Sequence, residues 1–141
     1  MRELGPALPD IDCIVQQEPG LWRIHWNDGL VIDATHCSHP ERLILSALIG
    51  TPDAHHLNDV HVTMLCANLM FAEDHALRVA LTHPGGELML ISEWLPELCV
   101  LHEFRDVLLQ HAARARYFAE LITEDVMLDP SLSPAQIVER I

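Results

Sequence analysis

Alternating apolar and polar positions near the start of the chain predict a β-hairpin. In "LWRIHW", Trp22, Ile24 and Trp26 share one face, while an arginine and a histidine occupy the other. This period of two is typical of a half-buried strand. The following "NDG", residues 27–29, contains residue types that tolerate positive φ, which predicts a tight turn. "LVIDATH", residues 30–36, is then expected to be the returning strand.

Three further apolar segments predict more strands. "RLILSALIG", residues 42–50, is short and apolar on both faces, so we expect a central or interface strand. Together with the hairpin before it, this segment predicts an antiparallel meander. "ALRVALT" at residues 76–82 and "ELMLIS" at residues 87–92 both show strand patterns. The "HPGG" between them, residues 83–86, predicts a hairpin connection.

The segment "LNDVHVTMLCANLMFA", residues 57–72, has helical spacing, but its apolar residues lie on nearly every face. Asn58 or Asp59 is the predicted N-cap, and the helix is expected to end near residues 71–73. One apolar stripe recurs every three or four residues, two leucines flank it, and other apolar side chains fill much of the rest. The stripe is Val60, Met64, Ala67 and Phe71; the flanking residues are Leu65 and Leu69; the others are Val62, Cys66 and Met70.

A single sheet can cover only one face of this helix. Leaving four large apolar side chains in water would forgo roughly 6 to 12 kcal/mol, at about 1.5 to 3 kcal/mol each. A second surface is therefore expected to cover the remaining face. The long C-terminal helix, a second subunit and a client chain are the three alternatives, and the pattern alone leaves all three open.

The clearest helical pattern spans residues 95–122. Pro96 suits the first turn, where a missing N–H group costs nothing. Apolar residues then recur at three- and four-residue spacing; they are Leu101, Phe104, Leu108, Ala112, Ala115 and Phe118. The predicted order is β-β-β-α-β-β-α, which is an α+β fold with an antiparallel sheet packed against helices.

The expected domain organisation has three parts. Residues 1–20 are rich in proline and glycine and are expected to be irregular, with at most a short helix. Residues 21–123 are expected to form a single α+β domain. Residues 124–141 are expected to be a C-terminal tail with a further helical turn over 135–141.

The net charge of the chain limits the kinds of molecule that it is expected to bind. The chain has 21 acidic residues against eight basic ones, all arginine, and a net charge of -13. Such a charge repels phosphate backbones, which argues against direct nucleic-acid binding. Acidity either keeps an apolar surface soluble or attracts a basic partner. Because no apolar run reaches the roughly 18 to 20 residues of a membrane span and no secretory signal is found, we expect a cytoplasmic protein.

The candidate chemistry is sparse. The four cysteines form no CxxC pair and are expected to be small buried side chains rather than disulfide partners; they are Cys13, Cys37, Cys66 and Cys99. The histidines of "HCSH", residues 36–39, and those at 55, 56 and 61 lack the paired spacing of a zinc site. Phosphate-binding and nucleophile motifs are absent. Glu103 and Asp106, one turn apart, fit a solvated helix face. We therefore expect no enzyme activity, no metal and no cofactor.

The order of these elements resembles class I type III secretion chaperones, the Tir-chaperone (CesT-like) family. The resemblance rests on a helix ending in Ala67-Asn68-Leu69, a strand, the hairpin Pro84-Gly85-Gly86, a second strand, and Leu95-Pro96 before the last helix. With the three preceding strands, it covers roughly residues 15–122. No one motif is specific; the order and spacing are.

The resemblance implies a cytosolic, homodimeric protein that uses no nucleotide. Such a protein binds the N-terminal segment of a secreted effector and keeps it secretion-competent. In the family, the helix matching residues 58–71 typically builds the dimer interface, which would cover the second apolar face. The expected interface residues are Val62, Leu65, Cys66, Leu69 and Met70.

Apolar residues on the strand faces are the expected contacts of an extended partner. They are Trp22, Ile24, Trp26, Leu43, Leu45 and Ile49. The alternative for each is an ordinary place in the core. Trp22 and Trp26 are favoured as contacts because tryptophan is enriched at binding hot spots.

The chain departs from the family at its N-terminus. Family members usually begin with a full amphipathic helix, whereas Pro6, Pro9, Pro19 and Gly20 leave room for a turn or two. Some chaperone-like members from plant-pathogen secretion clusters instead bind another small secretion-system protein and relieve repression of secretion genes. This regulatory role is the alternative function.

Overall fold

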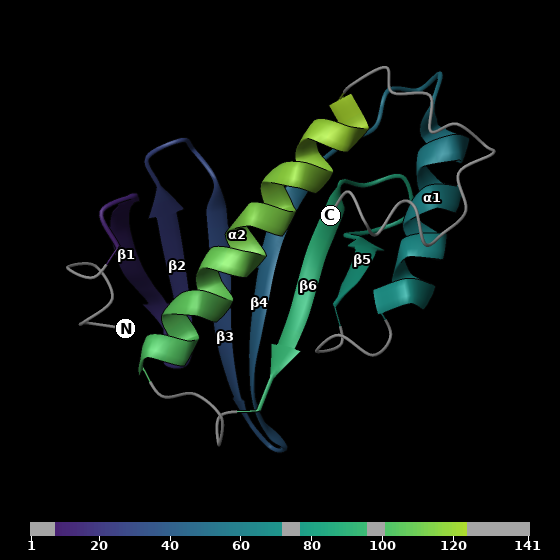
Figure 1. Ribbon diagram of the computed structural model, residues 1–141. Helices are drawn as coiled ribbons and strands as arrows, with labels where there is room; N and C mark the ends of the chain where they lie inside the picture. Colours follow the sequence, from purple (N-terminus) through teal and green to yellow (C-terminus); the bar gives the residue numbers. More distant parts are fainter. Residues whose placement is uncertain (1–7, 72–76, 96–100, 124–141) are drawn as a thin grey trace.

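A computed structural model describes residues 8–71, 77–95 and 101–123. Within these ranges the chain forms a six-stranded antiparallel sheet and two helices (Figure 1). The elements are β1 (Ile11–Glu18), β2 (Leu21–Trp26), β3 (Val31–Ser38), β4 (Glu41–Gly50), α1 (Leu57–Met70), β5 (Arg78–Leu81), β6 (Leu88–Trp94) and α2 (Leu101–Thr123). The predicted α+β class is confirmed.

The sheet has the strand order β1-β2-β3-β4-β6-β5. The predicted meander is present as β2, β3 and β4, with β4 in the interior of the sheet. Gly29 has a φ of 89° in the first turn, where the N–H of Leu30 donates to Asp28 Oδ1 over 3.1 Å. Because side chains of this turn stabilise it locally, the hairpin is readable from the sequence.

Strand β1 corrects the prediction of an irregular segment over residues 1–20. Residues Ile11–Glu18 pair with β2 in an antiparallel ladder that contains two register shifts. None of the eight residues is fully buried, and only Ile11 and Ile14 pack partly against the core. The ladder to β2, rather than an alternating apolar pattern, therefore holds this strand in place.

Helix α2 crosses one face of the sheet and lies against β4 (Figure 1). Side chains from the helix and from alternate sheet positions form the core between them. The largest fully buried ones are Ile24, Ile32, Leu45, Leu90, Leu108 and Phe118. The predicted start of this helix before residue 101 and the predicted turn over 135–141 lie outside the described residues.

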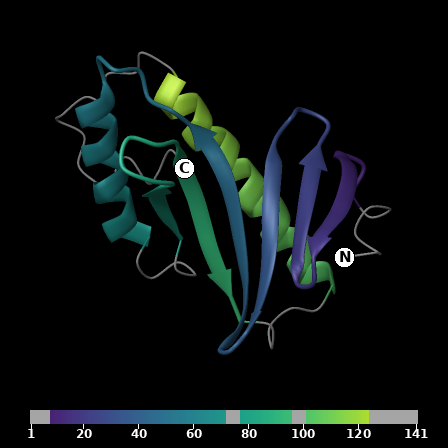
Figure 2. The ribbon, with the colours of Figure 1, turned by 180° about the vertical axis from the view of Figure 1, so that it is seen from behind.

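The opposite face of the sheet, called here the open face, is covered by neither described helix (Figure 2). Its side chains come from the strand positions that alternate with the core positions. They include Arg23, Asp33, Ile44 and Ile91.

Helix α1 lies beside β5, at one edge of the sheet (Figure 1). The side chain of Asn68 fastens it there, since Asn68 Nδ2 donates to the carbonyl of Val79 over 2.9 Å and the N–H of Val79 donates to Asn68 Oδ1 over 2.6 Å. The Asn68 amide therefore satisfies both backbone groups of Val79, as a neighbouring strand would. At the end of the helix, Phe71 meets Phe118 of α2 edge-to-face, with ring centroids 6.2 Å apart.

The start of α1 differs from the prediction. Its N-cap is His56, with no side-chain capping bond, rather than Asn58 or Asp59. Asp53 accounts for the earlier start, because its carboxylate accepts from the N–H of His55 and its carbonyl from the N–H of His56. This local turn leads the chain into the helix, which begins at Leu57. None of the described helices is both long and apolar enough to cross a bilayer.

Candidate functional site

The outer face of α1 carries a row of solvent-exposed apolar side chains, called here the outer stripe. It consists of Val62, Leu65, Cys66 and Leu69, which share one face at three- and four-residue spacing. Val62, Leu65 and Leu69 are 60%, 69% and 80% exposed. These are four of the five residues expected at a dimer interface; the side chain of Met70 lies outside the described part.

The inner face of the same helix is already used within the subunit. Met64, Ala67 and Phe71 are buried, and Val60 packs against the core. Helix α2 and the sheet therefore do not cover the outer stripe. Shielding three large apolar side chains from water is worth up to roughly 5 to 9 kcal/mol, which makes this row the strongest candidate for an interface.

The sheet residues expected to touch a partner divide into two groups. Ile24, Trp26, Leu45 and Ile49 are buried in the core beneath α2, which corrects their assignment as partner contacts. These four residues instead occupy the core positions that the sequence patterns left open as the alternative. Trp22 and Leu43 are half-buried and remain available at the margin.

Trp26 is held in the core by a charged residue of α2. The guanidinium carbon of Arg116 lies 5.0 Å from the centre of the indole ring, and Arg116 Nε donates to Asp28 Oδ2 over 2.5 Å. This pairing holds the pKa of Asp28 below its usual range. Trp26 is 3% exposed and lies under the Arg116 guanidinium. It therefore packs between the hairpin and α2 and does not present a binding surface.

A buried polar group also joins the sheet to α2. Ser92 Oγ and His111 Nδ1 lie 2.9 Å apart and share a hydrogen bond, and Trp94 Nε1 donates to Ser92 Oγ over 3.1 Å. A hydroxyl beside an imidazole resembles an activated nucleophile. Here both residues are 2% exposed, and burial lowers the pKa of His111 to about 4. A substrate cannot reach this pair, so its role is structural.

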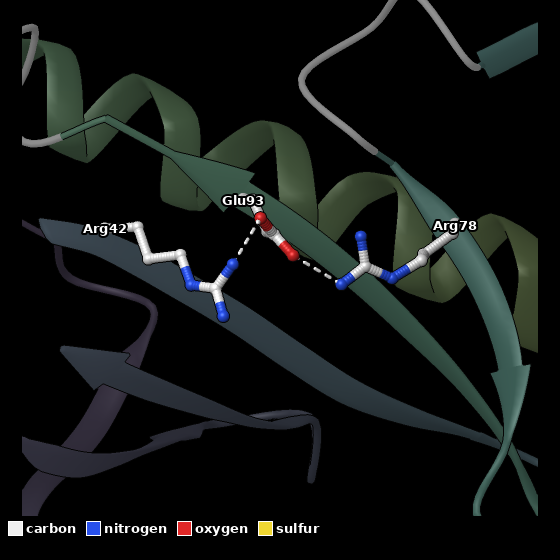
Figure 3. A network of polar contacts seen from close by, with 3 residues as sticks. All are labelled: Arg42, Arg78 and Glu93. Atoms are coloured by element: carbon white, nitrogen blue, oxygen red, sulfur yellow. Dashed lines mark hydrogen bonds and ion pairs between the residues drawn. The ribbon is translucent and has the colours of Figure 1, made fainter. Parts of the chain in front are cut away.

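Ion pairs on the open face were not anticipated from the sequence. Arg23 binds Asp33 through two hydrogen bonds of 2.8 Å. Further along, Arg42 of β4 and Arg78 of β5 approach Glu93 of β6 from its two sides, at 3.3 Å and 2.5 Å (Figure 3). The Arg78 hydrogen bond is the main reason that the pKa of Glu93 is lowered. The only feature of the sequence that could have indicated these ion pairs was the presence of charged residues at alternate strand positions.

The cysteines differ from the prediction. Cys13 and Cys66 are exposed and Cys37 is half-buried, all as free thiols, whereas all four cysteines were expected to be buried; Cys99 lies outside the described residues. Cys13 is exposed because it is on the edge strand, and Cys66 because it belongs to the outer stripe. In the described ranges, no three or more His, Cys, Asp or Glu side chains group in a way that would hold a metal ion.

Comparison with solved structures supports the described fold. A chain of the ExsC-ExsE complex matches with a TM-score of 0.65 and 13% identity, over 77% of this chain and 80% of that one. A chain of the HopA1-SchA chaperone-effector complex matches with a TM-score of 0.63 and 14% identity, over 76% and 80%. At these identities the likeness concerns the fold alone.

Comparison at the sequence level gives the family. No curated protein matches the chain. The model of the Tir chaperone protein (CesT) family matches residues 13–119, which include every described strand from β2 to β6, α1 and most of α2. The chain therefore belongs to the Tir chaperone protein (CesT) family.

Proposed function

We propose that the chain is a type III secretion chaperone that binds the N-terminal segment of a secreted effector and keeps it secretion-competent, without nucleotide. Its family membership and its structural likeness to a chain of a chaperone-effector complex support this role. The observation that carries the proposal is the apolar surface that the described residues leave exposed, both on the outer stripe and on the open face of the sheet, where Leu48 is 49% exposed. Binding, rather than catalysis, is the activity that such a surface supplies.

We further propose that the outer stripe pairs two copies of the chain into a homodimer. Val62, Leu65, Cys66 and Leu69 project from one face of α1, so the same row on a second subunit would be self-complementary. The remaining surfaces of both subunits would then be available to the effector. Half-buried Trp22 and Leu43 are retained as candidate effector contacts, whereas the four core residues are not.

The second candidate is a chaperone-like regulatory protein that binds a small secretion-system protein and relieves repression of secretion genes. The observation in its favour is β1. Where family members usually have an amphipathic helix that helps to form the effector groove, residues Ile11–Glu18 of this chain form an edge strand. A different N-terminal element favours a different partner.

Co-purification with the full-length chain from its native cells distinguishes the two functions. A secreted protein that is retained through its N-terminal segment, and lost when that segment is deleted, supports the chaperone. A small regulatory protein, with secreted effectors absent from the complex, supports the alternative. Substrate turnover by the purified chain would contradict both.

A further inference from the structure

The two edges of the sheet differ in how they are closed. At one edge, α1 lies alongside β5, and the Asn68 amide hydrogen-bonds both backbone groups of Val79. At the other edge, no described element pairs with the outer side of β1 (Figure 1). An unpaired strand edge is a template on which another extended chain can add its own strand. Among the described strands, β1 is therefore the place where an added strand can extend the sheet.

The ladder between β1 and β2 shows which backbone groups of β1 point outward. The N–H of Trp26 donates across the β2–β3 turn, so the backbone of Trp26 faces β3. By alternation, the backbone of Arg23 faces β1, where its partner is Val15. The residues on either side of Val15, Ile14 and Gln16, therefore direct their N–H and C=O groups away from the sheet. These are the groups to which an added strand would hydrogen-bond.

The side chains along this edge are acidic at both ends and uncharged between them. Asp10 and Asp12 precede the uncharged residues 13–17, and Glu18 follows them. All three carboxylates are solvent-exposed, and none makes an ion pair with another residue of the described ranges. The arginine of the adjacent strand, Arg23, is already held by two hydrogen bonds to β3. The edge therefore presents negative charge on both sides of an uncharged middle.

This charge pattern disfavours a second copy of the chain as the occupant of the edge. Two copies of β1 paired antiparallel about Val15 would place Glu18 of one copy opposite Asp12 of the other. Pairing about Ile14 would place Glu18 opposite Asp10. Like charges directly opposite each other destabilise a ladder, whereas opposite charges stabilise it. A strand with basic ends would therefore pair with this edge better than β1 pairs with itself.

We propose that the outer edge of β1 receives an extended segment of the protein partner that has an apolar middle and a basic residue at each end. The backbone of that segment would pair with the outward groups of Ile14 and Gln16. Its apolar side chains would lie beside Ile14 on the core face and beside Val15 on the open face. Its basic ends would meet Asp12 and Glu18. This inference rests on the proposed function and adds the position and the chemistry of the bound segment.

Short synthetic peptides titrated into the full-length, nitrogen-15-labelled chain test the proposal by NMR. The first peptide has alternating valine and threonine between two lysines. The second has glutamate in place of each lysine, and the third keeps the lysines but has proline in place of the central valine. We expect the first peptide to bind about tenfold more tightly than the second, because two opposite-charge pairs replace two like-charge pairs.

The proline peptide and hydrogen exchange separate strand addition from simple charge attraction. Proline lacks an N–H group and interrupts a ladder, so the third peptide should bind at least about tenfold more weakly than the first despite its equal charge. The first peptide should also slow the exchange of the Ile14 and Gln16 amides with solvent, because both become hydrogen-bonded.

Variants of the chain locate the effect. Gln16→Pro removes an outward N–H without removing a bond to β2 and should lose binding of the lysine peptide, whereas the matched Gln16→Ala keeps that N–H and should bind as wild type does. Because proline also stiffens β1, Asp12→Asn/Glu18→Gln provides a second test and should reduce the tenfold preference to about threefold or less. The control Asp59→Asn/Glu87→Gln removes the same charge from exposed sites outside β1 and should keep the preference.

Several results would overturn the inference: equal affinity for the lysine and glutamate peptides, equal binding of the proline peptide, unchanged exchange of the Ile14 and Gln16 amides, or full binding by Gln16→Pro. Peptide binding only after removal of residues 1–7 would mean that the chain itself occupies the edge. Shifts that grow with protein concentration alone would mean that a second copy does.

Co-purification separates this inference from the proposed function. If a secretion-system protein co-purifies equally with wild type and Gln16→Pro, the edge inference falls while the proposed function stands. Binding of the lysine peptide without any co-purified secretion-system protein gives the reverse result.

Discussion

At the scale of single residues, burial rather than residue type decides the role of the polar and aromatic side chains. His111, Ser92 and Trp94 form a hydrogen-bonded group between β6 and α2 instead of a reactive site. Trp26, a residue type favoured at binding hot spots, lies inside the core under Arg116. His111 and Trp26 each lead to a prediction about stability.

His111 should make folding sensitive to mild acid. Burial, with a smaller contribution from Arg114, lowers its pKa from 6.5 to about 4. As the pH falls, the unfolded chain therefore binds a proton at this histidine before the folded chain does. The stability that neutral His111 contributes is complete above the unfolded pKa of 6.5, and it is lost as the pH falls towards the folded pKa of about 4. We expect a loss of about 2 kcal/mol between about pH 7 and about pH 5 from this group.

Urea unfolding at the two pH values measures that loss. His111→Gln should show a shallower pH dependence than wild type, whereas the control His83→Gln, at an exposed hairpin position, should match wild type. An unchanged pH dependence in His111→Gln would show that other groups control the acid sensitivity.

Trp26→Ala should destabilise the fold. Removing a large core side chain leaves a cavity between β2 and α2 and deprives Arg116 of its ring contact. We expect the free energy of unfolding to fall by about 3 to 5 kcal/mol, measured by denaturant titration with circular dichroism. Trp22→Ala, at a half-buried position on the same strand, is the control and should cost less. If Trp26→Ala folds as stably as wild type, its assignment to the core is wrong.

At the scale of elements, α1 and β5 depend on each other. Strand β5 has four residues and one paired strand, β6, and Asn68 satisfies both backbone groups of Val79 on its outer edge. A short edge strand pairs weakly by itself. The asparagine of the "ANL" segment is therefore explained by its contact with the strand that follows it in sequence.

Asn68→Ala should loosen this edge. Two hydrogen bonds are lost and the Val79 N–H is left without its acceptor, which costs about 1 to 3 kcal/mol. We expect the Val79 amide to exchange hydrogen with solvent at least about tenfold faster, measured by NMR. Asn58→Ala, at an exposed site in the first turn of the same helix, should leave that rate unchanged. Equal protection of Val79 in both variants would contradict the bridging role of Asn68.

At the scale of the whole molecule, the described elements leave two surfaces uncovered: the outer stripe on α1 and the open face of the sheet. They lie on different elements, so one can pair subunits while the other receives a partner chain. A subunit with both surfaces exposed has a large apolar area in contact with water, and its net charge of -13 keeps such subunits from associating non-specifically.

The paired charge substitution Leu65→Asp/Leu69→Asp should abolish the proposed dimer. An aspartate buried against an apolar partner helix has no compensating charge, so the dissociation constant should rise by about 100-fold or more. Size-exclusion chromatography with light scattering measures the change. The control Val15→Asp, an exposed apolar position on β1 at the opposite edge of the sheet, should leave the assembly intact. A wild-type chain that is already monomeric would remove the interface assignment.

Local patterns determined much of the fold. The strand segments predicted at 21–26, 42–50 and 87–92, the turn at 27–29 and the long amphipathic helix follow from period and turn chemistry, both of which act over a few residues. The order of elements that resembled the CesT-like family was also a property of the sequence, and the family is confirmed. The apolar stripe on each face of α1 was likewise visible before folding.

Only the tertiary structure decided which of the apolar residues are buried. Whether Trp26 or Leu65 is covered depends on where α2 and β5 lie, and those positions are set by contacts between residues far apart in sequence. The same is true of β1, held by its ladder to β2, and of the Arg42–Glu93–Arg78 group, which three strands bring together. Sequence patterns report the period of an element, whereas burial and charge pairing depend on what packs against it.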